Sequence, residues 1–416
     1  MLKVGIIGVG TVGSSVVKIL QNSKDLITSK VNQEIVPVLG VVKNLSKKRD
    51  IDITLSDNID DILNNDDIDI VVELMGGVED AYEVVKRALL KGKYVVTANK
   101  ALLAYHRYDL ESISNKHLGY EASVAGGIPI VKALKEGLSA NNISSIKGIM
   151  NGTSNFMLTK MIKEGFKYDE ILKIAQDLGY AEADPTFDVG GHDAAHKILI
   201  LASIAYNIDA KPEEILIEGI ENITKDEIKF AKEFGYEIKL LGICKKIGSE
   251  IDIRVHPVFI SCDDMISKVN GVMNAITVKG DMVEESMYYG PGAGGDATAS
   301  AVVADIIDIA RGHNDSLLGY TDNKSTYTLM SSDDIHTEYY VRIHVADEIG
   351  VLNQITKIFA SKNISISTFL QNSDEKTATL LFSTHKAKEK NIKSALVEIE
   401  KLSFVKEKPS MMRIEK

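Results

Sequence analysis

The segment that most constrains this chain lies at its start, where a short apolar run is followed by closely spaced glycines. Gly8, Gly10 and Gly13 fit the pattern G-x-G-x-x-G, and residues 3–8 have the apolar character of a buried strand. After them, apolar residues recur at the spacing of a helix, at Val12, Val16, Ile19 and Leu20. In such a unit the first glycine permits a tight turn, the second admits a pyrophosphate, and the third lets helix and strand pack closely. The pattern therefore predicts a dinucleotide site at the helix start, formed by Gly8, Gly10, Thr11, Val12 and Gly13.

The first third of the chain continues this alternation of short apolar runs and amphipathic segments. Such a pattern is typical of βαβ units, which place their strands in a parallel sheet with helices on its faces. We expect strands over residues 3–8, 35–42, 69–73, 94–97 and 120–123, and an intervening helix over 81–90. The fold class predicted here is α/β, with a Rossmann-type dinucleotide-binding domain over residues 1–135 that is completed by residues from about 290 to 312.

A cluster of basic residues follows the second expected strand. An acidic residue at the end of that strand would bind the ribose hydroxyls of NAD, whereas a cation there suits the 2′-phosphate of NADP. The chain has Lys43 at this point, and Lys47, Lys48 and Arg49 come shortly after it. The sequence therefore favours NADP over NAD. A solvated basic loop without a ligand would give the same pattern.

The middle of the chain has a different order of elements. Helical periodicity over 155–164, 168–178 and 193–206 precedes strand-like alternation over 237–247, 251–260 and 276–287, and a glycine-rich loop then leads into a helix over 297–310. This order predicts an α+β domain with an open, largely antiparallel sheet over residues 136–312.

The last hundred residues begin with a polar stretch over 313–337, which is typical of a linker. Residues 338–416 then give strand patterns over 340–345, 364–370 and 377–384, helical patterns between them, and a short final strand near 404–406. The order βαββαβ predicts a small ferredoxin-like domain.

Composition excludes several classes of function. Hydrophobic residues make up 44% and charged residues 26% of the 416 residues, as in a folded globular protein, and the net charge is −11. An acidic chain without a basic patch lacks the electrostatic surface that binds nucleic acid or an anionic membrane. No apolar stretch approaches the roughly 18 residues of a membrane helix, no cleavable leader is recognisable, and two cysteines give no disulfide framework. We therefore expect a cytoplasmic protein without a nucleic-acid or membrane partner.

The densest group of ionisable residues lies between positions 182 and 197. Asp193 and Lys197 are four residues apart on a helix expected to begin near Gly191, and Lys197 opens the apolar run 198–202. A lysine at the mouth of a core helix and beside acids would be partly desolvated and held in place, as a proton donor must be. An exposed pair at this spacing is also common on helix surfaces, so spacing alone leaves both interpretations open. The group consists of Glu182, Asp184, Asp188, Asp193 and Lys197.

Four further motifs follow the glycine turn in order. They are Thr-Ala-Asn-Lys over 97–100, Ala-Gly-Gly-Ile-Pro over 125–129, Asn-Gly-Thr-Ser-Asn over 151–155 and Gly-Tyr-Ala-Glu-Ala-Asp-Pro over 179–185. With these motifs the chain resembles homoserine dehydrogenases over essentially its whole length. The resemblance implies interconversion of L-aspartate 4-semialdehyde and L-homoserine with NAD(P)H by direct hydride transfer, on the route to threonine and methionine. It also implies that the domain over residues 136–312 binds the substrate, carries catalysis and forms a dimer contact, and that the protein is a homodimer or homotetramer.

The same resemblance implies roles for individual residues. Lys197 matches the proton-donating lysine, Lys100 matches a second lysine beside the nicotinamide, and Asp193 matches an acid that orients them. Glu182 and Asp188 match acids of the substrate pocket. The cofactor site would also include Lys43, Met75, Gly76, Lys100, Gly292 and Gly294. A monovalent cation, expected to be sodium, would be surrounded by oxygen atoms of Glu121, Val124, Gly126 and Ile128.

The final domain resembles an ACT domain, a regulatory module of amino-acid biosynthetic enzymes. The similarity lies in residues 346–352 and 363–366, with Ile349 where the usual motif has proline. Asp347 and Gly350 at the strand-to-helix turn would bind the charged ends of an amino acid, and threonine is the effector that the resemblance implies. A purely structural role in oligomerisation is the alternative.

Two other functions compete with this interpretation. An NAD(P)-dependent oxidoreductase acting on an acyl phosphate needs an activated cysteine, but Cys244 and Cys262 lie in strand-like stretches and are expected to be buried structural thiols. A non-catalytic sensor of nucleotide and amino acid would not need both lysines. His192 and His196 have metal-ligand spacing without a third ligand nearby, and we expect them on the surface.

Overall fold

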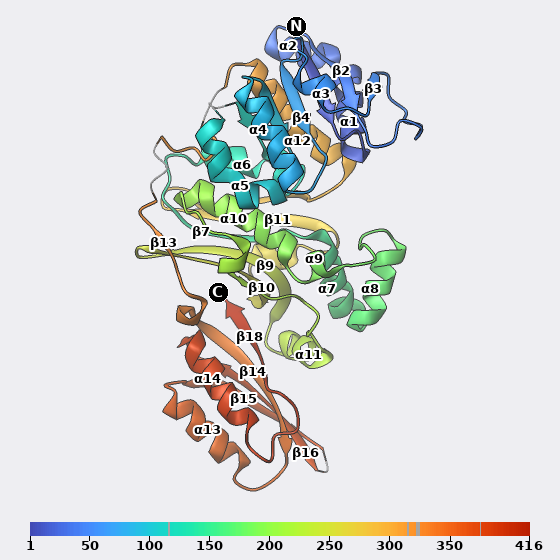
Figure 1. Ribbon diagram of the computed structural model, residues 1–416. Helices are drawn as coiled ribbons and strands as arrows, with labels where there is room; N and C mark the ends of the chain where they lie inside the picture. Colours follow the sequence, from blue (N-terminus) through green and yellow to red (C-terminus); the bar gives the residue numbers. More distant parts are fainter. Residues whose placement is uncertain (115–116, 314–315, 322–324, 375) are drawn as a thin grey trace.

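The parallel sheet expected at the start of the chain is present in the computed structural model, which describes residues 1–114, 117–313, 316–321, 325–374 and 376–416 (Figure 1). Within the described residues six strands pair in parallel, with β1 between β2 and β4. In spatial order they are β3 (Thr54–Ser56), β2 (Ile35–Val41), β1 (Leu2–Ile7), β4 (Ile70–Glu73), β5 (Tyr94–Thr97) and β6 (Leu118–Gly119). This is the doubly wound order of dinucleotide-binding folds, whose ligands lie beside the carboxyl end of the first strand.

Helices cover this sheet because each has one apolar stripe that faces it. In α1, for example, Val16 and Leu20 pack with Val4 and Ile6 of β1 in one buried cluster. The helix α12 (Gly295–Ala310) comes from far along the chain and packs beside α1 (Figure 1). The other helices are α1 (Thr11–Asn22), α2 (Lys24–Val31), α3 (Asp60–Leu63), α4 (Glu79–Leu90) and α5 (Lys100–Ile113).

The prediction of the last strand of this sheet, over residues 120–123, is wrong. Residues 121–123 form a turn of 3₁₀ helix, η1 (Glu121–Ser123), and the edge strand is the short β6 just before it. Hydrogen bonds from outside the sheet explain the difference. The Glu121 N–H donates to Asp305 Oδ2 at 2.8 Å, and the Glu121 carboxylate accepts from the N–H groups of Val131 and Lys132. The unexpected strand β3 has three residues, which are too few for a periodic signal.

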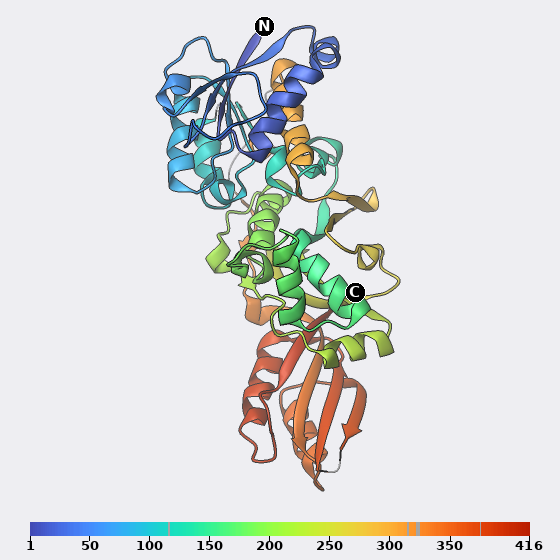
Figure 2. The same cartoon turned by 90° about the vertical axis from the view of Figure 1, so that its right-hand side faces the viewer.

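A second, mixed sheet forms the middle of the molecule and continues into the C-terminal domain (Figures 1 and 2). Neighbouring strands in its first part are antiparallel, as expected. They are β12 (Glu284–Pro291), β11 (Met273–Gly280), β7 (Ile143–Ile149), β9 (Tyr236–Ile247) and β10 (Glu250–Ser261), and the short β8 (Leu216–Ile217) and β13 (Thr328–Leu329) also pair with β10. Residues 276–287, expected as one strand, form parts of a hairpin. Its turn contains the exposed apolar residues Met282 and Val283, so the apolar pattern does not mark the break.

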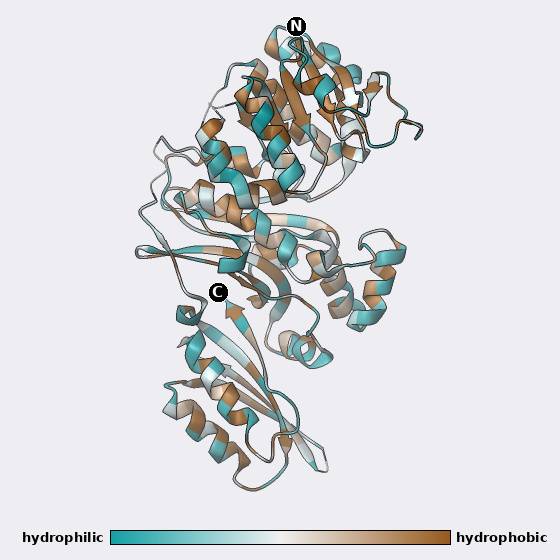
Figure 3. Cartoon of the chain, in the orientation of Figure 1, coloured by the Kyte–Doolittle hydropathy of each residue, from teal (hydrophilic) through white to brown (hydrophobic). Residues whose placement is uncertain are grey.

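Helix α10 (His192–Tyr206) is the most buried helix of the middle domain, as its apolar sequence predicts. All of its residues except His192 and Ala205 are buried, so its polar residues are also enclosed. Within the described residues, the other helices and helical turns of the middle domain are α6 (Ile130–Lys132), the π-helical turn η2 (Ala133–Gly137), α7 (Gly152–Glu164), α8 (Tyr168–Asp177), α9 (Thr186–Val189), η3 (Pro212–Glu214), α11 (Lys225–Glu233) and η4 (Met265–Lys268). Figure 3 shows apolar residues concentrated on the strands and on the helix faces turned toward them.

The C-terminal domain has the expected ferredoxin-like arrangement, with strand order β18-β14-β16-β15. Its last strand, however, is not near 404–406, where only the isolated bridge Val345–Val405 forms. The strand lies further on, and its buried Arg413 and Glu415 hide the apolar alternation that marks a strand. The elements are η5 (Ser332–Asp334), β14 (His336–Ala346), α13 (Val351–Ser361), β15 (Ile366–Ser373), β16 (Thr377–Thr384), β17 (Ala387–Lys388), α14 (Glu389–Glu400) and β18 (Ser410–Glu415).

The strand β18 joins the two domains into one sheet. It pairs in parallel with β10 of the middle domain and antiparallel with β14 of the C-terminal domain. Part of the expected linker 313–337 forms β13 and η5, while 314–315 and 322–324 lie outside the described residues. The domain boundaries expected near 135, 312 and 337 stay predictions. In the described part of the chain, helices are too short or too polar to cross a membrane.

Candidate active site

The glycine turn between β1 and α1 forms a cradle at the edge of the first sheet. Gly8 has a φ of 101°, and a Cβ there would lie 2.4 Å from the carbonyl oxygen of Leu74. A Cβ at Gly13 would lie 2.4 Å from the carbonyl oxygen of Gly8, whereas one at Gly10 would meet nothing within 4 Å. Only glycine therefore fits at Gly8 and Gly13, and the space beside Gly10 is open. Helix α1 has no side-chain cap, so its first N–H groups can bind an anion. The cradle fits a pyrophosphate.

A cavity of 350 Å³ extends from this cradle along the ends of β1, β2 and β4. Arg49 is held at its wall, with Nε donating to the carbonyl of Val9 at 2.9 Å and Nη1 to that of Asn44 at 3.0 Å. Lys43 is exposed at the rim. Of the expected cofactor residues, Gly8, Gly10, Lys43 and Met75 line this cavity, and Gly76 follows Met75 with a φ of 75°.

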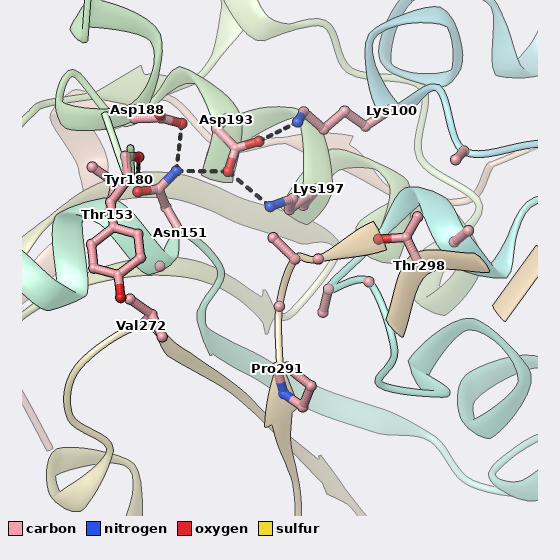
Figure 4. Close-up of a pocket in the computed structure, with 18 of the residues that line it drawn as sticks. Lys100, Asn151, Thr153, Tyr180, Asp188, Asp193, Lys197, Val272, Pro291 and Thr298 are labelled. Atoms are coloured by element: carbon pink, nitrogen blue, oxygen red, sulfur yellow. Dashed lines mark hydrogen bonds and ion pairs between the residues drawn. The ribbon is translucent and has the colours of Figure 1, made fainter. Parts of the chain in front are cut away.

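A second cavity of 560 Å³ lies between the first sheet and the middle domain (Figure 4). Its walls come from segments far apart in sequence. Lys100 at the start of α5 and the first turn of α10 meet along one part of its wall, and the glycine loop 292–294 lines another part. A Cβ at Gly126 would lie 2.8 Å from the carbonyl oxygen of Gly292, so two glycine loops meet at this edge. The expected residues Lys100, Asp188, Asp193, Lys197, Gly292 and Gly294 all line it.

Asp193 lies at the centre of a charged cluster in this cavity (Figure 4). One carboxylate oxygen is 2.7 Å from Lys100 Nζ, and the other accepts from Lys197 Nζ at 2.8 Å. Lys197 Nζ also donates to the carbonyl of Met150 at 2.6 Å. Asn151 Nδ2 donates to Asp193 Oδ2 at 2.9 Å and to Asp188 Oδ1 at 2.7 Å. Two lysines separated by 97 positions thus share one carboxylate.

Burial and neighbouring charges set the protonation of this cluster. Burial lowers the pKa of Lys197, although Asp193 partly opposes the effect. Burial also acts to lower the pKa of Lys100, but the charge of Asp193 outweighs it and the pKa is raised. Burial acts to raise the pKa of Asp193, but the two lysines outweigh burial and hold that pKa well below its usual range. Burial and the charge of Asp193 raise the pKa of Asp188. Asp193 is therefore ionised, and Lys197 is the lysine that releases a proton more easily.

Local hydrogen bonds explain how two of the motifs fix the positions of side chains in the charged cluster. In the Thr-Ala-Asn-Lys motif, Asn99 caps α5 by accepting from the N–H of Leu102 at 3.0 Å, which fixes Lys100 on the first turn. In the Asn-Gly-Thr-Ser-Asn motif, Asn151 caps α7 in the same way, accepting from Ser154 at 2.8 Å. Asn151 therefore serves as both helix cap and ligand of the acids. The sequence pointed to this motif but predicted no role for Asn151.

Some expected site residues lie outside the two cavities. Glu182 is exposed and does not line the substrate cavity. Val124 and Ile128 are buried in the turn before α6, and Ala125 and Gly126 between them both have a φ of 55°. No group of three or more acidic, histidine or cysteine side chains within the described residues could hold a metal.

Three other expectations have different outcomes. His196 is buried, which is contrary to the expected surface position, and burial lowers its pKa to about 4; His192 is exposed. Cys244 is buried as expected, whereas Cys262 is partly exposed just after β10. At the C-terminal turn, Asp347 is exposed and Gly350 begins α13 with a φ of 92°.

Comparison with known proteins identifies the family. The sequence profile of homoserine dehydrogenase matches residues 129–307, the profile of its NAD-binding domain matches 8–119, and that of the ACT domain matches 339–404. The homoserine dehydrogenase of Helicobacter pylori is 51% identical over 417 residues, which cover 100% of this chain and 99% of that protein. This chain belongs to the homoserine dehydrogenase family.

Solved structures of homoserine dehydrogenases agree with this assignment. The enzyme from Thiobacillus denitrificans superposes with a TM-score of 0.96 at 42% identity, covering 100% of this chain and 98% of that one. A hyperthermophilic archaeal homoserine dehydrogenase, solved in complex with NADPH, gives a TM-score of 0.64 at 26% identity. The match covers 78% of this chain and 99% of that one. The expected family, fold class and oxidoreductase activity are therefore confirmed.

The shared carboxylate of Asp193 leads to a prediction about how kcat depends on pH. In Asp193→Asn the lysines lose their counter-charge, so the pKa of Lys197, which Asp193 raises against burial, should fall further. We expect kcat for aldehyde reduction to fall by about 10²-fold, the usual size of an impaired general acid. The alkaline limb of the pH–kcat profile should move to lower pH. Steady-state rates across pH measure both effects.

Asp177→Asn is the matched control, because Asp177 is an exposed carboxylate at the end of α8. It should leave the rate and the profile unchanged. An Asp193→Asn enzyme with the normal alkaline limb would show that the carboxylate does not set the protonation of Lys197.

Proposed function

We propose that this homoserine dehydrogenase interconverts L-aspartate 4-semialdehyde and L-homoserine, with Lys197 as the proton donor and Lys100 as a second cation. The observation that carries the proposal is the cluster in which Asp193 holds both lysines at 2.7 and 2.8 Å within one cavity. An oxyanion that develops at the substrate carbon needs a cationic donor, and ammonium groups held by a carboxylate meet that need.

The number of donors on Lys197 supports its role. An ammonium group has three N–H bonds. Asp193 and the Met150 carbonyl accept two of them, and the residue lines the cavity. The third is free to face a substrate oxygen. In aldehyde reduction Lys197 gives its proton to that oxygen; in homoserine oxidation the neutral amine takes it back.

The glycine cradle and the cavity beside it would hold a nicotinamide dinucleotide. Gly8, Gly10 and Gly13 would bind the pyrophosphate with Thr11 and Val12 at the helix start, and Gly292 and Gly294 would close the nicotinamide end. When bound, the nicotinamide supplies or accepts the hydride. The remaining acids, Asp188 and Glu182, would bind the ammonium group of the substrate. Because Glu182 is exposed here, its role requires the segment between α8 and α9 to approach the substrate.

A monovalent cation, expected to be sodium, would lie at the turn that includes Glu121, Val124, Gly126 and Ile128. The Glu121 carboxylate already accepts from two N–H groups of α6, at 2.9 and 2.8 Å. The ligands would therefore be main-chain oxygens, the hard donors that sodium prefers. Left-handed Ala125 and Gly126 give the tight curvature that such a ring of carbonyls requires.

The wider biological role follows from the family and the C-terminal domain. We place the enzyme in threonine and methionine biosynthesis, in the cytoplasm, as a homodimer or homotetramer. Its ACT domain would bind threonine at the Asp347–Gly350 turn. The uncapped start of α13 and the exposed carboxylate of Asp347 offer donors and an acceptor for the two charged ends of an amino acid.

The proton-donor role has a direct test. Lys197→Ala should lower kcat by at least about 10²-fold while KM for the cofactor changes little, because in the proposed mechanism Lys197 binds the reacting oxygen of the substrate and not the cofactor. For the normal enzyme, aldehyde reduction should decline as pH rises through the Lys197 pKa, which lies below 10.5, and homoserine oxidation should increase over the same range.

Lys93→Ala provides the control, since Lys93 is also a buried lysine bound to main-chain carbonyls but lies outside both cavities. Near-normal kcat in Lys197→Ala would refute the assignment.

The preference for NADP has its own test. Lys43→Ala should reduce kcat/KM with NADPH by about tenfold, which equals about 1.4 kcal/mol and is within the range of a lost charge-assisted hydrogen bond. The value with NADH should stay within about twofold. Lys48→Ala, an exposed neighbour that does not line the cavity, is the control. A normal enzyme that prefers NADH would contradict the proposal.

Regulation is tested by titration with threonine. Millimolar threonine should inhibit the normal enzyme, and Asp347→Ala should weaken the inhibition at least about tenfold by removing a charged contact. Asp374→Ala, a carboxylate that also lies in the C-terminal domain, should not. Absence of inhibition in the normal enzyme would favour a structural role for the domain.

A further inference from the structure

The C-terminal strand carries an arginine that the proposed mechanism does not use. Arg413 on β18 is 1% exposed, and its guanidinium lies between two carboxylates. Its Nε donates to Glu389 Oε2 of α14 at 2.9 Å, and Nη2 pairs with the other oxygen of Glu389. Nη1 and Nη2 also donate to the two oxygens of Glu218, at 2.7 and 3.1 Å. A two-pronged pair of this kind fixes orientation as well as distance, so Glu218 is held relative to the C-terminal domain.

Glu218 lies in the segment 216–221, which packs against the junction of α9 and α10. The Glu218 N–H donates to the Val255 carbonyl at 2.8 Å, and the Ile220 N–H donates to the Val189 carbonyl at 3.0 Å. The backbones are in direct contact. A Cβ at Gly219 would lie 2.5 Å from the Val189 oxygen, and one at Gly191 would lie 3.3 Å from the Glu218 oxygen. Little room remains for one segment to move without the other.

The junction that this segment supports carries the acids of the active site. Asp188 immediately precedes Val189, and Asp193 lies two residues after Gly191. Gly191 starts α10 with a φ of 88°, and its carbonyl accepts from Ala195 at 3.0 Å in the first turn of the helix. A shift of segment 216–221 would therefore displace Asp188 and Asp193 relative to Lys100, which lies on a different element, α5.

We propose that Arg413, acting through Glu218, positions the α9–α10 junction and so sets the geometry of the Asp193 cluster. Both are positioning residues, because neither lines the cavity in which the reaction would occur. The inference rests on the roles proposed above for Asp193 and Lys197. It makes the C-terminal strand part of the support of the active site, in addition to its place in the sheet.

A matched pair of ion pairs allows a sharp test. Glu218→Gln weakens the pair with Arg413, and the side chain of Glu218 is 41% exposed. Asp226→Asn weakens a second pair with the C-terminal domain, from Asp226 to Arg342 at 3.2 Å, and Asp226 is 51% exposed. Asp226 lies on α11, which packs against β9 rather than at the α9–α10 junction. Each variant therefore removes the charge of an acid that pairs with an arginine of the C-terminal domain, and only Glu218 belongs to the segment that packs against the α9–α10 junction.

We expect Glu218→Gln to lower kcat by about tenfold with KM for the cofactor unchanged, since small displacements of catalytic groups have large effects on rate. Its alkaline limb should move to lower pH, because Lys197 faces Asp193, Lys100 and Asp188, and a more distant Asp193 supports its charge less. Asp226→Asn should stay within about twofold with an unchanged profile. Thermal unfolding of both variants should be similar.

Arg413→Lys is the second variant, because it keeps a positive charge against the buried Glu389 but cannot form the two-pronged pair. It should lower kcat as Glu218→Gln does, and the double variant should be no worse than the stronger single one, since both act through one contact. Normal kcat and pH profile in Glu218→Gln, or an equal loss in Asp226→Asn, would overturn the proposal.

Lys197→Ala in the same assay separates this inference from the proposed mechanism. A large loss in Lys197→Ala with none in Glu218→Gln overturns only the positioning role. Unchanged rates in both overturn both.

Discussion

One carboxylate shared by two ammonium groups is the interaction on which the active site depends. Without Asp193, Lys100 and Lys197 would repel each other, and burial would favour the neutral form of Lys197. With it, both lysines stay cationic and keep fixed positions. The pair from Asp193 to Lys100 also crosses between the first sheet and the middle domain. The carboxylate that sets the charge of the site is therefore also part of a contact between the two domains.

Burying this charged cluster costs folding free energy, and the surrounding structure compensates for that cost. Desolvating charged groups often costs more than their attraction returns, so a buried cluster of this kind adds little stability by itself. Helix α10 offsets the cost through the apolar run after Lys197, which is fully buried, and the helix packs against α5 and against strands β7, β9 and β10. Asn151 also donates a hydrogen bond to Asp193, and Lys197 donates one to the Met150 carbonyl, so the cluster gains two further polar contacts. The stability of the apolar helix thus allows ionised groups at its first turn.

Sequence predicted the parts of this structure that local rules determine. The glycine turn, the parallel strands and the core helix follow from spacing and periodicity, and the resemblance to homoserine dehydrogenases brought Lys100, Asp193 and Lys197 together in one site. Features that depend on contacts with residues far away in the sequence were harder to predict. Glu121 leaves the sheet because of Asp305, 184 positions away. The last strand is hidden because Arg413 and Glu415 are charged yet buried by partners on other elements. The exposed position of Glu182 cannot be read from its motif.

The continuous sheet determines how a ligand at the C-terminal domain could affect catalysis. Strand β14 pairs with β18 through residues 338–342, and the turn with Asp347 begins directly after its end. A ligand at that turn changes activity only if it binds more tightly to one arrangement of the sheet than to another. Because β18 also pairs with β10, and Glu218 hydrogen-bonds to β10 at Val255, a rearrangement of β14 has a covalent and hydrogen-bonded route toward α10. A rigid attachment of the two domains would remove that route, so regulation by this domain requires that the β14–β18–β10 pairing have two stable arrangements.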